Sequence, residues 1–254
     1  MVTTNDRGVL VTGASGGIGR AIAVAFARAG DRVAVHYSTR RTEAEQTVAG
    51  LPGDGHALVS GDLADPRQVA DLAAAAGDAL GGVDVLVNNA AVVTSGYSVA
   101  NADYDTWQRA WQETVAVNLF GAANLSYCVA RALIARGVAG AIVNVGSRGA
   151  FRGEPDASAY GASKAGLHAL GQSLAVSLAP HGISVTSVAP GFVETDRVAG
   201  RLSGESGAAI RAQSPYGRVA APEEVAAAVV YLASPAARWS TGAVLDVNGA
   251  SYLR

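Results

Sequence analysis

Short apolar runs alternate along the chain with segments in which apolar residues recur every three or four positions. The short runs are rich in valine and have the length of β-strands, whereas the periodic segments have the spacing of helices. Strands are expected at residues 9–12, 32–37, 56–60, 83–87, 141–145, 183–188 and 243–247, and helices at 18–29, 43–49, 66–80, 104–136, 158–179 and 222–232. This order predicts an α/β fold of about seven parallel strands, doubly wound, with helices on both faces.

One segment, residues 194–218, departs from the alternation and is rich in glycine, serine and arginine. It is either a surface loop or a mobile lid over a binding site, because long loops in compact domains often carry function. Of these two roles, we expect the lid over a substrate site. No linker, repeat or change of composition divides the chain, so residues 1–254 are expected to form a single domain.

Composition narrows the class of protein. Half of the residues are hydrophobic, 16% are charged and the formal net charge is −2, without a run of lysine or arginine, so a nucleic-acid partner is not expected. Residues 1–8 lack the pattern of a signal peptide, the apolar runs are too short to span a membrane, and nothing indicates a metal site. The single cysteine, Cys128, excludes an internal disulfide and favours a cytoplasmic location; we expect it to be a buried packing residue.

A glycine-rich turn, Thr12-Gly13-Ala14-Ser15-Gly16-Gly17-Ile18-Gly19, follows the first expected strand and begins the first helix. Glycines let the backbone turn sharply and approach a pyrophosphate, whose charge the helix N-terminus favours. A tight turn that binds nothing is the structural alternative. The position at the first strand–helix connection favours a Rossmann-type dinucleotide site.

The spacing of this turn, T-G-x-x-x-G-x-G, resembles the fingerprint of the classical short-chain dehydrogenase/reductase family. Further motifs follow in that family's order along almost the whole chain: Asp62-Leu63, Asn88-Asn89-Ala90-Ala91, Asn118, Ser147, Tyr160-Gly-Ala-Ser-Lys164 and Pro190-Gly191-Phe-Val-Glu-Thr195. Ala91 departs from the family, which more often has glycine there. The chain is similar to 3-oxoacyl-[acyl-carrier-protein] reductases and to glucose-dehydrogenase-like ketoreductases.

The resemblance implies contacts to a nicotinamide dinucleotide, with Asp62 at the adenine and residues 190–195 near the nicotinamide. Each has a structural alternative: Asp62 could cap a turn, and Asn88 and Asn89 could stabilise a strand end. Together with the end of the second strand, the expected cofactor residues are Gly13, Ser15, Gly16, Gly17, Ile18, Gly19, Tyr37, Ser38, Arg40, Asp62, Leu63, Asn89, Ala90, Ala91, Tyr160, Lys164, Pro190, Gly191, Val193 and Thr195.

The end of the second strand distinguishes NAD from NADP. An acidic residue there binds the ribose 2′-hydroxyl and repels a 2′-phosphate. Here the strand ends in Tyr37-Ser38-Thr39-Arg40-Arg41, and no carboxylate occurs until Glu43. A hydroxyl and two guanidinium groups suit a phosphate, so NADP(H) is the expected cofactor and NAD(H) the alternative. The two arginines could also be solvated residues at a helix start.

The candidate reactive groups are Ser147, Tyr160 and Lys164. Reduction of a ketone needs a hydride and a proton; a free tyrosine has a pKa of about 10, which a nearby cation lowers toward neutrality. Tyr160 and Lys164 are four residues apart on an expected helix and share a face, and Ser147 could bind the substrate oxygen. The resemblance adds Asn118, which would hold a water linked to Lys164, and contacts of Lys164 to the ribose. Similar enoyl reductases have a longer Tyr–Lys spacing, so carbonyl–alcohol chemistry is favoured over C=C reduction.

The expected function is an NADP(H)-dependent ketoreductase with a small-molecule carbonyl or alcohol substrate. Candidate substrate-lining residues are Tyr97, Arg148, Phe151 and Phe192, a mixture that suits a fairly apolar carbonyl compound with or without an anionic group. The alternatives are an NAD-dependent alcohol or sugar dehydrogenase and, less favoured, a dinucleotide sensor without turnover. The resemblance also implies a homo-oligomer, a tetramer or a dimer.

Overall fold

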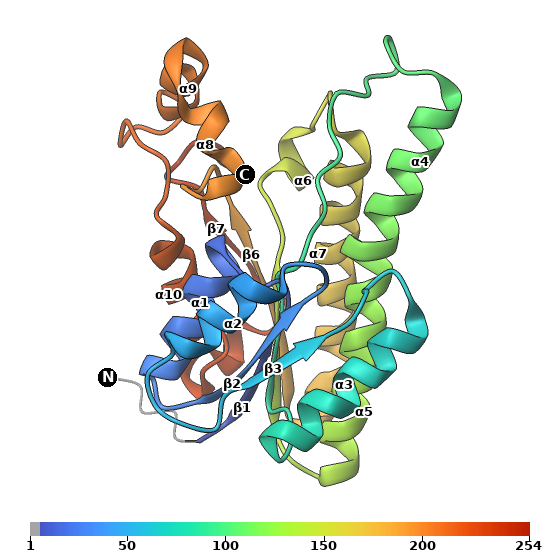
Figure 1. Cartoon of the computed structure of the whole chain (residues 1–254), viewed down its shortest axis with the longest axis vertical. Coiled ribbons are helices and arrows are strands. Elements are labelled where there is room, and N and C mark those ends of the chain that lie inside the picture. Colours follow the sequence, from blue (N-terminus) through green and yellow to red (C-terminus); the bar gives the residue numbers. More distant parts are fainter. Residues whose placement is uncertain (1–5) are drawn as a thin grey trace.

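The computed structural model describes residues 6–254 and contains one sheet of seven parallel strands (Figure 1). The expectation about a signal peptide falls partly on residues 1–5, which lie outside the described residues. The strand order is β3-β2-β1-β4-β5-β6-β7. The strands are β1 (Gly8–Val11), β2 (Arg32–Tyr37), β3 (Ala57–Ser60), β4 (Val85–Asn88), β5 (Gly140–Val145), β6 (Ile183–Pro190) and β7 (Val244–Val247).

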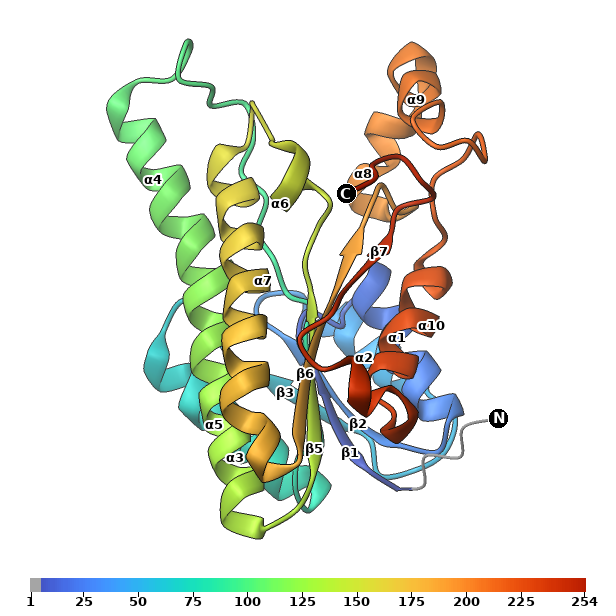
Figure 2. The same cartoon turned by 180° about the vertical axis from the view of Figure 1, so that it is seen from behind.

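Helices cover both faces of this sheet, so the predicted doubly wound α/β architecture is confirmed. Helices α1, α2 and α10 lie on one face, and α3, α5 and α7 lie on the other (Figures 1 and 2). The helices are α1 (Gly17–Arg28), α2 (Arg41–Ala49), α3 (Pro66–Leu80), α4 (Tyr104–Val115), α5 (Ala122–Arg136), α6 (Gly149–Arg152), α7 (Ser158–Leu178), α8 (Asp196–Ala199), α9 (Gly204–Arg211) and α10 (Pro222–Leu232).

The period-two alternation of each strand divides the core into two clusters, one on each face of the sheet. In β1, Val9 and Val11 pack with Phe26 of α1 and Val225 of α10, whereas Leu10 points to the opposite cluster with residues of α3 and α5. Both faces of the strand are therefore apolar, which explains why the strands are continuous hydrophobic runs rather than alternating ones.

The parallel register brings the carboxyl ends of the central strands to one edge of the sheet. Val11 pairs with Val87, Asn88 with Asn144, and Val145 with Val188. The segments after β1, β4, β5 and β6 consequently leave the sheet at the same edge, where open α/β sheets bind ligands.

The single helix expected at residues 104–136 has an irregularity. The helices α4 and α5 are joined by a π-helical turn, Ala116–Gly121, which carries Asn118. Such turns arise where tertiary contacts override the regular backbone pattern, and they are common at functional sites. By length and composition this continuous helix could cross a membrane, but 44% of its most apolar window is buried within the fold.

Two other expectations differ from the structure, and the segment after Ser147 contains a short helix, α6, that the pattern did not predict. The segment 194–218 is not an irregular loop, because it contains α8 and α9, which project beyond the sheet edge (Figure 1). Cys128 is half-buried on α5 rather than fully buried, and burial raises the pKa of its thiol.

Candidate functional site

The glycine-rich loop between β1 and α1 has almost no room for side chains. Gly13 and Gly17 have positive φ angles of 63° and 53°. A Cβ atom on Gly19 would lie 2.3 Å from the carbonyl oxygen of Gly13 and 2.5 Å from Nδ2 of Asn89. Gly16 begins α1 with an extended backbone and no side-chain cap, which leaves the first N–H groups of the helix to bind an anion. Ser15 and Ile18 are half-buried beside it. The loop therefore fits the pyrophosphate of a dinucleotide.

Thr12 and Asn89 hold this loop against the segment that follows β4. The hydroxyl of Thr12 accepts hydrogen bonds from the main-chain N–H groups of Asn89 at 2.9 Å and Ala90 at 3.0 Å. The amide of Asn89 donates to the carbonyl of Thr12 at 2.8 Å. Asn89 thus organises the backbone of the expected cofactor site, and Ala90 and Ala91 are half-buried beside it. Its neighbour Asn88 is buried and forms hydrogen bonds with Ser126 and Asn144. For Asn88 the alternative role, that of stabilising a strand end, therefore applies.

His36 is a site residue that sequence reasoning did not identify. Its Nδ1 accepts the N–H of Gly13 at 3.1 Å, and its Nε2 lies 3.0 Å from the carbonyl oxygen of Gly61. This arrangement requires a neutral ring with the proton on Nε2. Burial lowers the pKa of His36, which favours this neutral form, although Gly61 and Asp62 oppose the shift. The sequence signal that could have identified His36 is its position as a polar residue within an otherwise apolar strand.

Arg40 and Arg41 lie at the start of α2, and Arg40 is beside the glycine-rich loop. Arg40 Nη1 would be 3.5 Å from a Cβ atom on Gly16. Arg40 is also ion-paired with Glu43 at 2.9 Å and is about half exposed, while Arg41 pairs with Glu45 at 2.8 Å. Ser38 is exposed and Tyr37 half-buried next to them. The carboxylate of Glu43 is therefore held by Arg40, the residue that immediately precedes α2.

Asp62 and Leu63 follow β3 and have different surroundings. Asp62 is exposed, and its Oδ1 accepts the N–H of Ala64 at 2.9 Å, as in the turn-capping alternative. Leu63 is 5% exposed and its side chain belongs to the core beside α3 and α5. Only its main chain remains available for the cofactor contact that the resemblance implies.

The segment after β6 lies over the glycine-rich loop. Gly191 donates to the carbonyl of Val247 at 3.1 Å, which continues the pairing of Pro190 with Val247. Val193 forms an isolated bridge with Ala220, so the two ends of segment 194–218 meet at its base. The methyl group of Thr195 would be 3.1 Å from a Cβ atom on Gly17. These contacts bring together the first and last parts of the expected cofactor site.

The three candidate reactive side chains meet at the carboxyl end of β5. Lys164 is 2% exposed, and its Nζ donates to the carbonyl of Val145 at 2.8 Å and lies 5.8 Å from the centre of the Tyr160 ring. Ser147 is 9% exposed and its Oγ accepts the N–H of Gly149 at 3.0 Å. Tyr160 and Lys164 therefore lie close together, and Ser147 follows the strand whose last carbonyl Lys164 binds.

Asn118 lies next to this group but has another set of partners than expected. Its Oδ1 accepts the N–H of Val92 and its Nδ2 donates to the carbonyl of Val92, both at 2.9 Å. Nδ2 also donates to Oγ of Ser163 at 3.1 Å, and that hydroxyl donates to the carbonyl of Tyr160. Asn118 therefore connects the segment after β4 to the helix that carries Tyr160.

Two of the expected substrate-lining residues, Tyr97 and Phe151, pack against other side chains of the protein. Tyr97 is 1% exposed, its hydroxyl accepts the N–H of Ala159 at 3.1 Å, and its ring packs against Trp107. The prediction that Tyr97 lines the substrate space is wrong, because this ring belongs to a small core cluster. The ring of Phe151 stacks on His168 at 5.2 Å, and Arg254 lies 4.2 Å from its centre.

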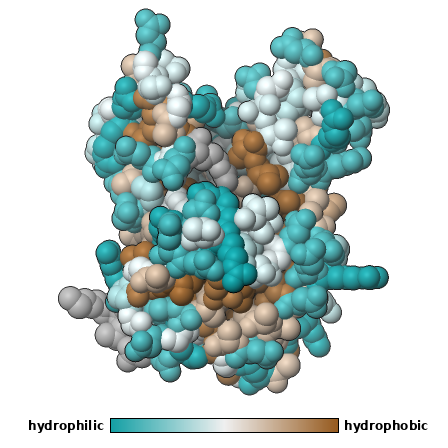
Figure 3. Space-filling view, viewed as in Figure 1, coloured by the Kyte–Doolittle hydropathy of each residue, from teal (hydrophilic) through white to brown (hydrophobic). Residues whose placement is uncertain are grey.

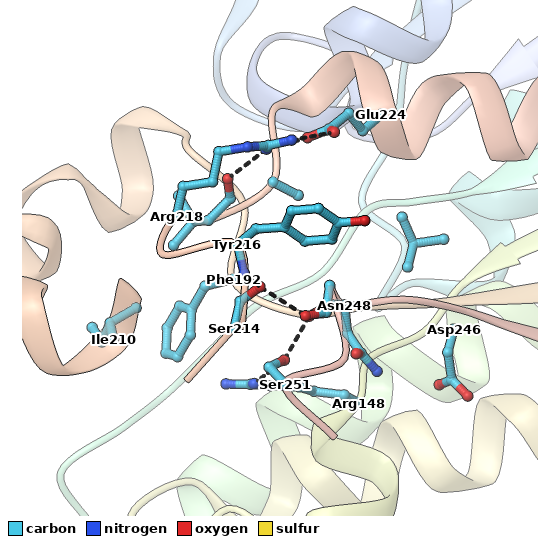
Figure 4. Close-up of a pocket in the computed structure, with 14 residues that line it drawn as sticks. Arg148, Phe192, Ile210, Ser214, Tyr216, Arg218, Glu224, Asp246, Asn248 and Ser251 are labelled. Atoms are coloured by element: carbon cyan, nitrogen blue, oxygen red, sulfur yellow. Dashed lines mark hydrogen bonds and ion pairs between the residues drawn. The ribbon is translucent and has the colours of Figure 1, made fainter. Parts of the chain in front are cut away.

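The other two, Arg148 and Phe192, line a pocket of about 300 Å³ (Figure 4). Its walls come from the end of segment 194–218 and from the C-terminal tail (residues 248–254), including Ser214, Asn248 and Ser251. Ser147, Tyr160 and Lys164 do not line it, although Ser147 precedes Arg148 in the chain. Figure 3 shows a hollow at this end of the molecule, between α9 and α4, with hydrophobic residues on its walls.

Comparison with known proteins agrees with this geometry. A family model described as enoyl-(acyl carrier protein) reductase matches residues 13–250. The chain is 38% identical over 248 residues to L-rhamnose 1-dehydrogenase (NAD(P)(+)) of Sphingomonas sp. (strain SKA58), and 37% identical over 244 residues to the 3-oxoacyl-[acyl-carrier-protein] reductase FabG of Escherichia coli (strain K12). In both cases 96% of each chain is covered.

Solved structures give the same result. A 3-ketoacyl-(acyl-carrier-protein) reductase from Brucella melitensis complexed with NADH superposes with a TM-score of 0.87 at 29% identity, covering 98% of this chain and 99% of that one. Similarity over nearly the whole length, in sequence and in fold, confirms the resemblance found in the motifs. The chain belongs to the short-chain dehydrogenase/reductase family of oxidoreductases.

Proposed function

We propose that this protein is an NADP(H)-dependent oxidoreductase that interconverts a carbonyl compound and a secondary alcohol, with Tyr160 as the acid/base. The observation that carries the proposal is the position of Lys164, whose buried ammonium group lies 5.8 Å from the centre of the Tyr160 ring. A cation there stabilises the phenolate relative to the phenol, which makes proton transfer possible near neutral pH.

The roles of the other groups follow from their chemistry. The bound nicotinamide supplies or accepts the hydride. Tyr160 gives a proton to the substrate oxygen in reduction and removes it in oxidation, while the hydroxyl of Ser147 donates a hydrogen bond to that oxygen. Asn118 acts as a positioning residue, because it holds the segment after β4 and, through Ser163, the turn of α7 at Tyr160.

The preference for NADP(H) is supported by the position of Arg40 beside Gly16, where the 2′-phosphate of the cofactor would need a cation. The pairing of Arg40 with Glu43 favours the second candidate, an NAD-dependent alcohol or sugar dehydrogenase, because a carboxylate near the ribose repels a phosphate. The similarity to a rhamnose dehydrogenase that takes NAD(P)(+) is compatible with either cofactor. We retain NADP(H) because the guanidinium of Arg40 lies nearer to the helix start than any carboxylate of α2.

Three further features belong to this proposal. The chain acts as one domain in the cytoplasm, and segment 194–218 acts as a lid whose ends meet at Val193 and Ala220. The protein is a homo-oligomer, a tetramer or a dimer. Large apolar side chains exposed on helices and at the last strand support this: Phe120, Tyr127, Val176, Tyr231, Trp239 and Leu245.

The test is oxidation of NADPH with a panel of ketones, β-ketoesters, acyl thioesters, quinones and sugars, followed by Tyr160→Phe on the best substrate. We expect Tyr160→Phe to abolish turnover and to leave NADPH binding intact. The matched control is Tyr104→Phe, which removes a hydroxyl from a largely exposed tyrosine on α4 and should keep full activity. Activity of Tyr160→Phe at the level of the wild type would refute the assignment.

A further inference from the structure

Arg148 is a buried cation at the edge of the proposed reaction site. It follows Ser147 directly, is 5% exposed and is fixed by neutral partners. Its Nη1 donates to Oγ of Ser251 in the C-terminal tail, and its Nη2 donates to Oε1 of Gln213 at 2.5 Å. The guanidinium also lies 5.1 Å from the centre of the Phe192 ring, a favourable position for a cation.

The charges around Arg148 are unbalanced. Arg152 shares the same oxygen of Gln213 at 3.1 Å, and Arg201 lies 5.2 Å from the other partner, the Phe192 ring. Among the described side chains, no carboxylate forms an ion pair with any of these three arginines. Burial and then the charge of Arg152 lower the pKa of Arg148, and the carboxylate of Glu154 only partly opposes them.

The pocket in Figure 4 has the same imbalance. Four charged residues line it, and three of them are ion-paired: Arg218 with Glu224 at 2.7 Å, and Asp246 with Arg254 at 3.0 Å. Arg148 is the fourth. A guanidinium has five N–H donors, of which the bonds to Ser251 and Gln213 use two. The remaining donors make no hydrogen bond to the described residues and are available to a ligand, and an anion there would balance the charge of a guanidinium that has no ion-paired carboxylate among those residues.

We propose that Arg148 binds an anionic oxygen group of the substrate, so that the site acts on hydroxy acids or oxo acids rather than on neutral carbonyl compounds. The inference rests on the proposed function and names its substrate class. Ser147 and Arg148 are adjacent, with Cα atoms about 3.8 Å apart. Because the side chain of Arg148 lines the pocket of Figure 4, a substrate whose reacting oxygen lies at Ser147 can extend its carboxylate or phosphate toward that pocket and Arg148. Segment 194–218 contributes to this anion site, because Gln213 comes from that segment.

The experiment compares matched pairs of secondary alcohols with NADP(+). The 3-, 4- and 5-hydroxy acids are each measured against their methyl esters, and 3-hydroxybutyl phosphate is measured against 1,3-butanediol. Wild type should favour one anionic member by about 10- to 100-fold in kcat/KM, as expected for a hydrogen bond to a charged group. A preference confined to the acids identifies a carboxylate site, and one confined to the phosphate identifies a phosphate site; both support the proposal.

Arg148→Gln should bring the ratio of kcat/KM between the anionic and the neutral member close to one, a ratio that a uniform loss of activity would not change. The matched control is Arg152→Gln, which removes a bond to the same Gln213 oxygen from an exposed residue and should keep the preference. Equal kcat/KM values for both members of every pair in wild type overturn the proposal. A proportional loss for both members in Arg148→Gln also overturns it, because Arg148 would then only fasten the lid and the tail.

A binding measurement separates this inference from the proposed function. The hydroxy acid should raise the Tm of wild type but not of Arg148→Gln, and its ester should raise neither. If no alcohol is oxidised and this Arg148-dependent shift is still present, the anion site stands and the proposed reaction is wrong. If neither turnover nor the shift is seen, both are wrong.

Discussion

Asn118 holds both main-chain groups of Val92, its Oδ1 accepting the N–H and its Nδ2 donating to the carbonyl, each at 2.9 Å. The same Nδ2 reaches Ser163 on α7. One buried side chain on the π-helical turn thus fixes the distance between the segment that follows β4 and the helix that carries Tyr160 and Lys164. Both sides of the proposed reaction site depend on this contact.

Asn118→Ala should therefore reduce both stability and turnover. The side chain is 1% exposed, and its loss leaves the partly exposed Val92 groups without partners, so the free energy of unfolding should fall by about 1–3 kcal/mol. Misplacement of the segment after β4 should lower kcat by about 10- to 100-fold and raise the KM for the cofactor. Urea unfolding and steady-state kinetics measure the two effects.

The control for Asn118 is Ser163→Ala, which removes the bond between the two helices and the bond to the carbonyl of Tyr160 but leaves the contact of Asn118 with Val92. It should cost less than about 1.5 kcal/mol and leave the KM for the cofactor unchanged. If Asn118→Ala and Ser163→Ala have equal effects on that KM, the contact with Val92 does not position the cofactor site.

Gly19→Ala should weaken cofactor binding by at least about tenfold, because a Cβ atom there would lie 2.3 Å from the carbonyl oxygen of Gly13 and displace the loop. Titration of NADPH fluorescence measures the change. The control is Gly77→Ala within α3, where nothing lies within 4 Å of the added atom. That variant should bind NADPH normally and be about 0.5–1 kcal/mol more stable, because alanine favours a helix. Normal NADPH affinity in Gly19→Ala would contradict the assignment of this loop.

Arg40→Gln should lower the kcat/KM for NADP(H) by about 10- to 100-fold and leave that for NAD(H) nearly unchanged, since only NADP(H) has the 2′-phosphate. Glu43→Gln should act in the opposite direction, because it releases Arg40 from its ion pair and removes a repelling charge. Arg41→Gln is the control at the neighbouring position. These kinetic constants should be measured at low ionic strength, where exposed charges are least screened. A wild type that prefers NAD(H) would overturn the cofactor proposal.

The sequence predicted the sheet because it depends on local patterns, and the functional roles of the residues at its edge stay predictions. Continuous apolar runs of strand length and a glycine-rich turn after the first of them indicate where β1 ends and α1 begins. The π-helical turn was not predictable, since it follows from the tertiary contacts of Asn118 with Val92 and Ser163. A local pattern of helical periodicity contains no sign of partners that lie 26 and 45 residues away.

The errors in the candidate site have a related cause. Tyr97 has an apolar ring and a polar hydroxyl, and those properties suit a substrate wall and a core position equally well. The structure shows that the ring is buried between α4 and α7 and is therefore a core residue. Arg148 was expected near the substrate, but its unbalanced charge became visible only when Gln213 and Ser251, distant in the chain, were seen as its neutral partners.

His168 gives a prediction for the dependence of stability on pH. It lies one turn beyond Lys164 on α7, is 4% exposed, and neither ring nitrogen makes a hydrogen bond of regular geometry to the described residues, although the backbone of Ser147 is near the ring. Burial lowers its pKa to about 4, with Lys164 adding to the shift and the backbone of Ser147 opposing it. The folded protein therefore keeps the ring neutral at a pH where the unfolded chain, with an ordinary histidine pKa of about 6.5, already binds a proton. The free energy of unfolding is therefore unaffected by this histidine above pH 6.5. It decreases as the pH falls from 6.5 to about 4, because there the unfolded chain binds a proton that the folded protein does not.

The loss should be on the order of 3 kcal/mol between these two pH values. Urea unfolding of wild type and of His168→Leu at pH 7, 5.5 and 4 measures it, and the variant should lose correspondingly less stability over this range. His181→Leu, at an exposed histidine beyond the end of the same helix, should decline as steeply as wild type. Because the ring of His168 stacks on Phe151, its protonation should also disturb the turn after Ser147. Equal slopes for wild type and His168→Leu would show that the ring is already protonated, or reaches water, in the folded protein.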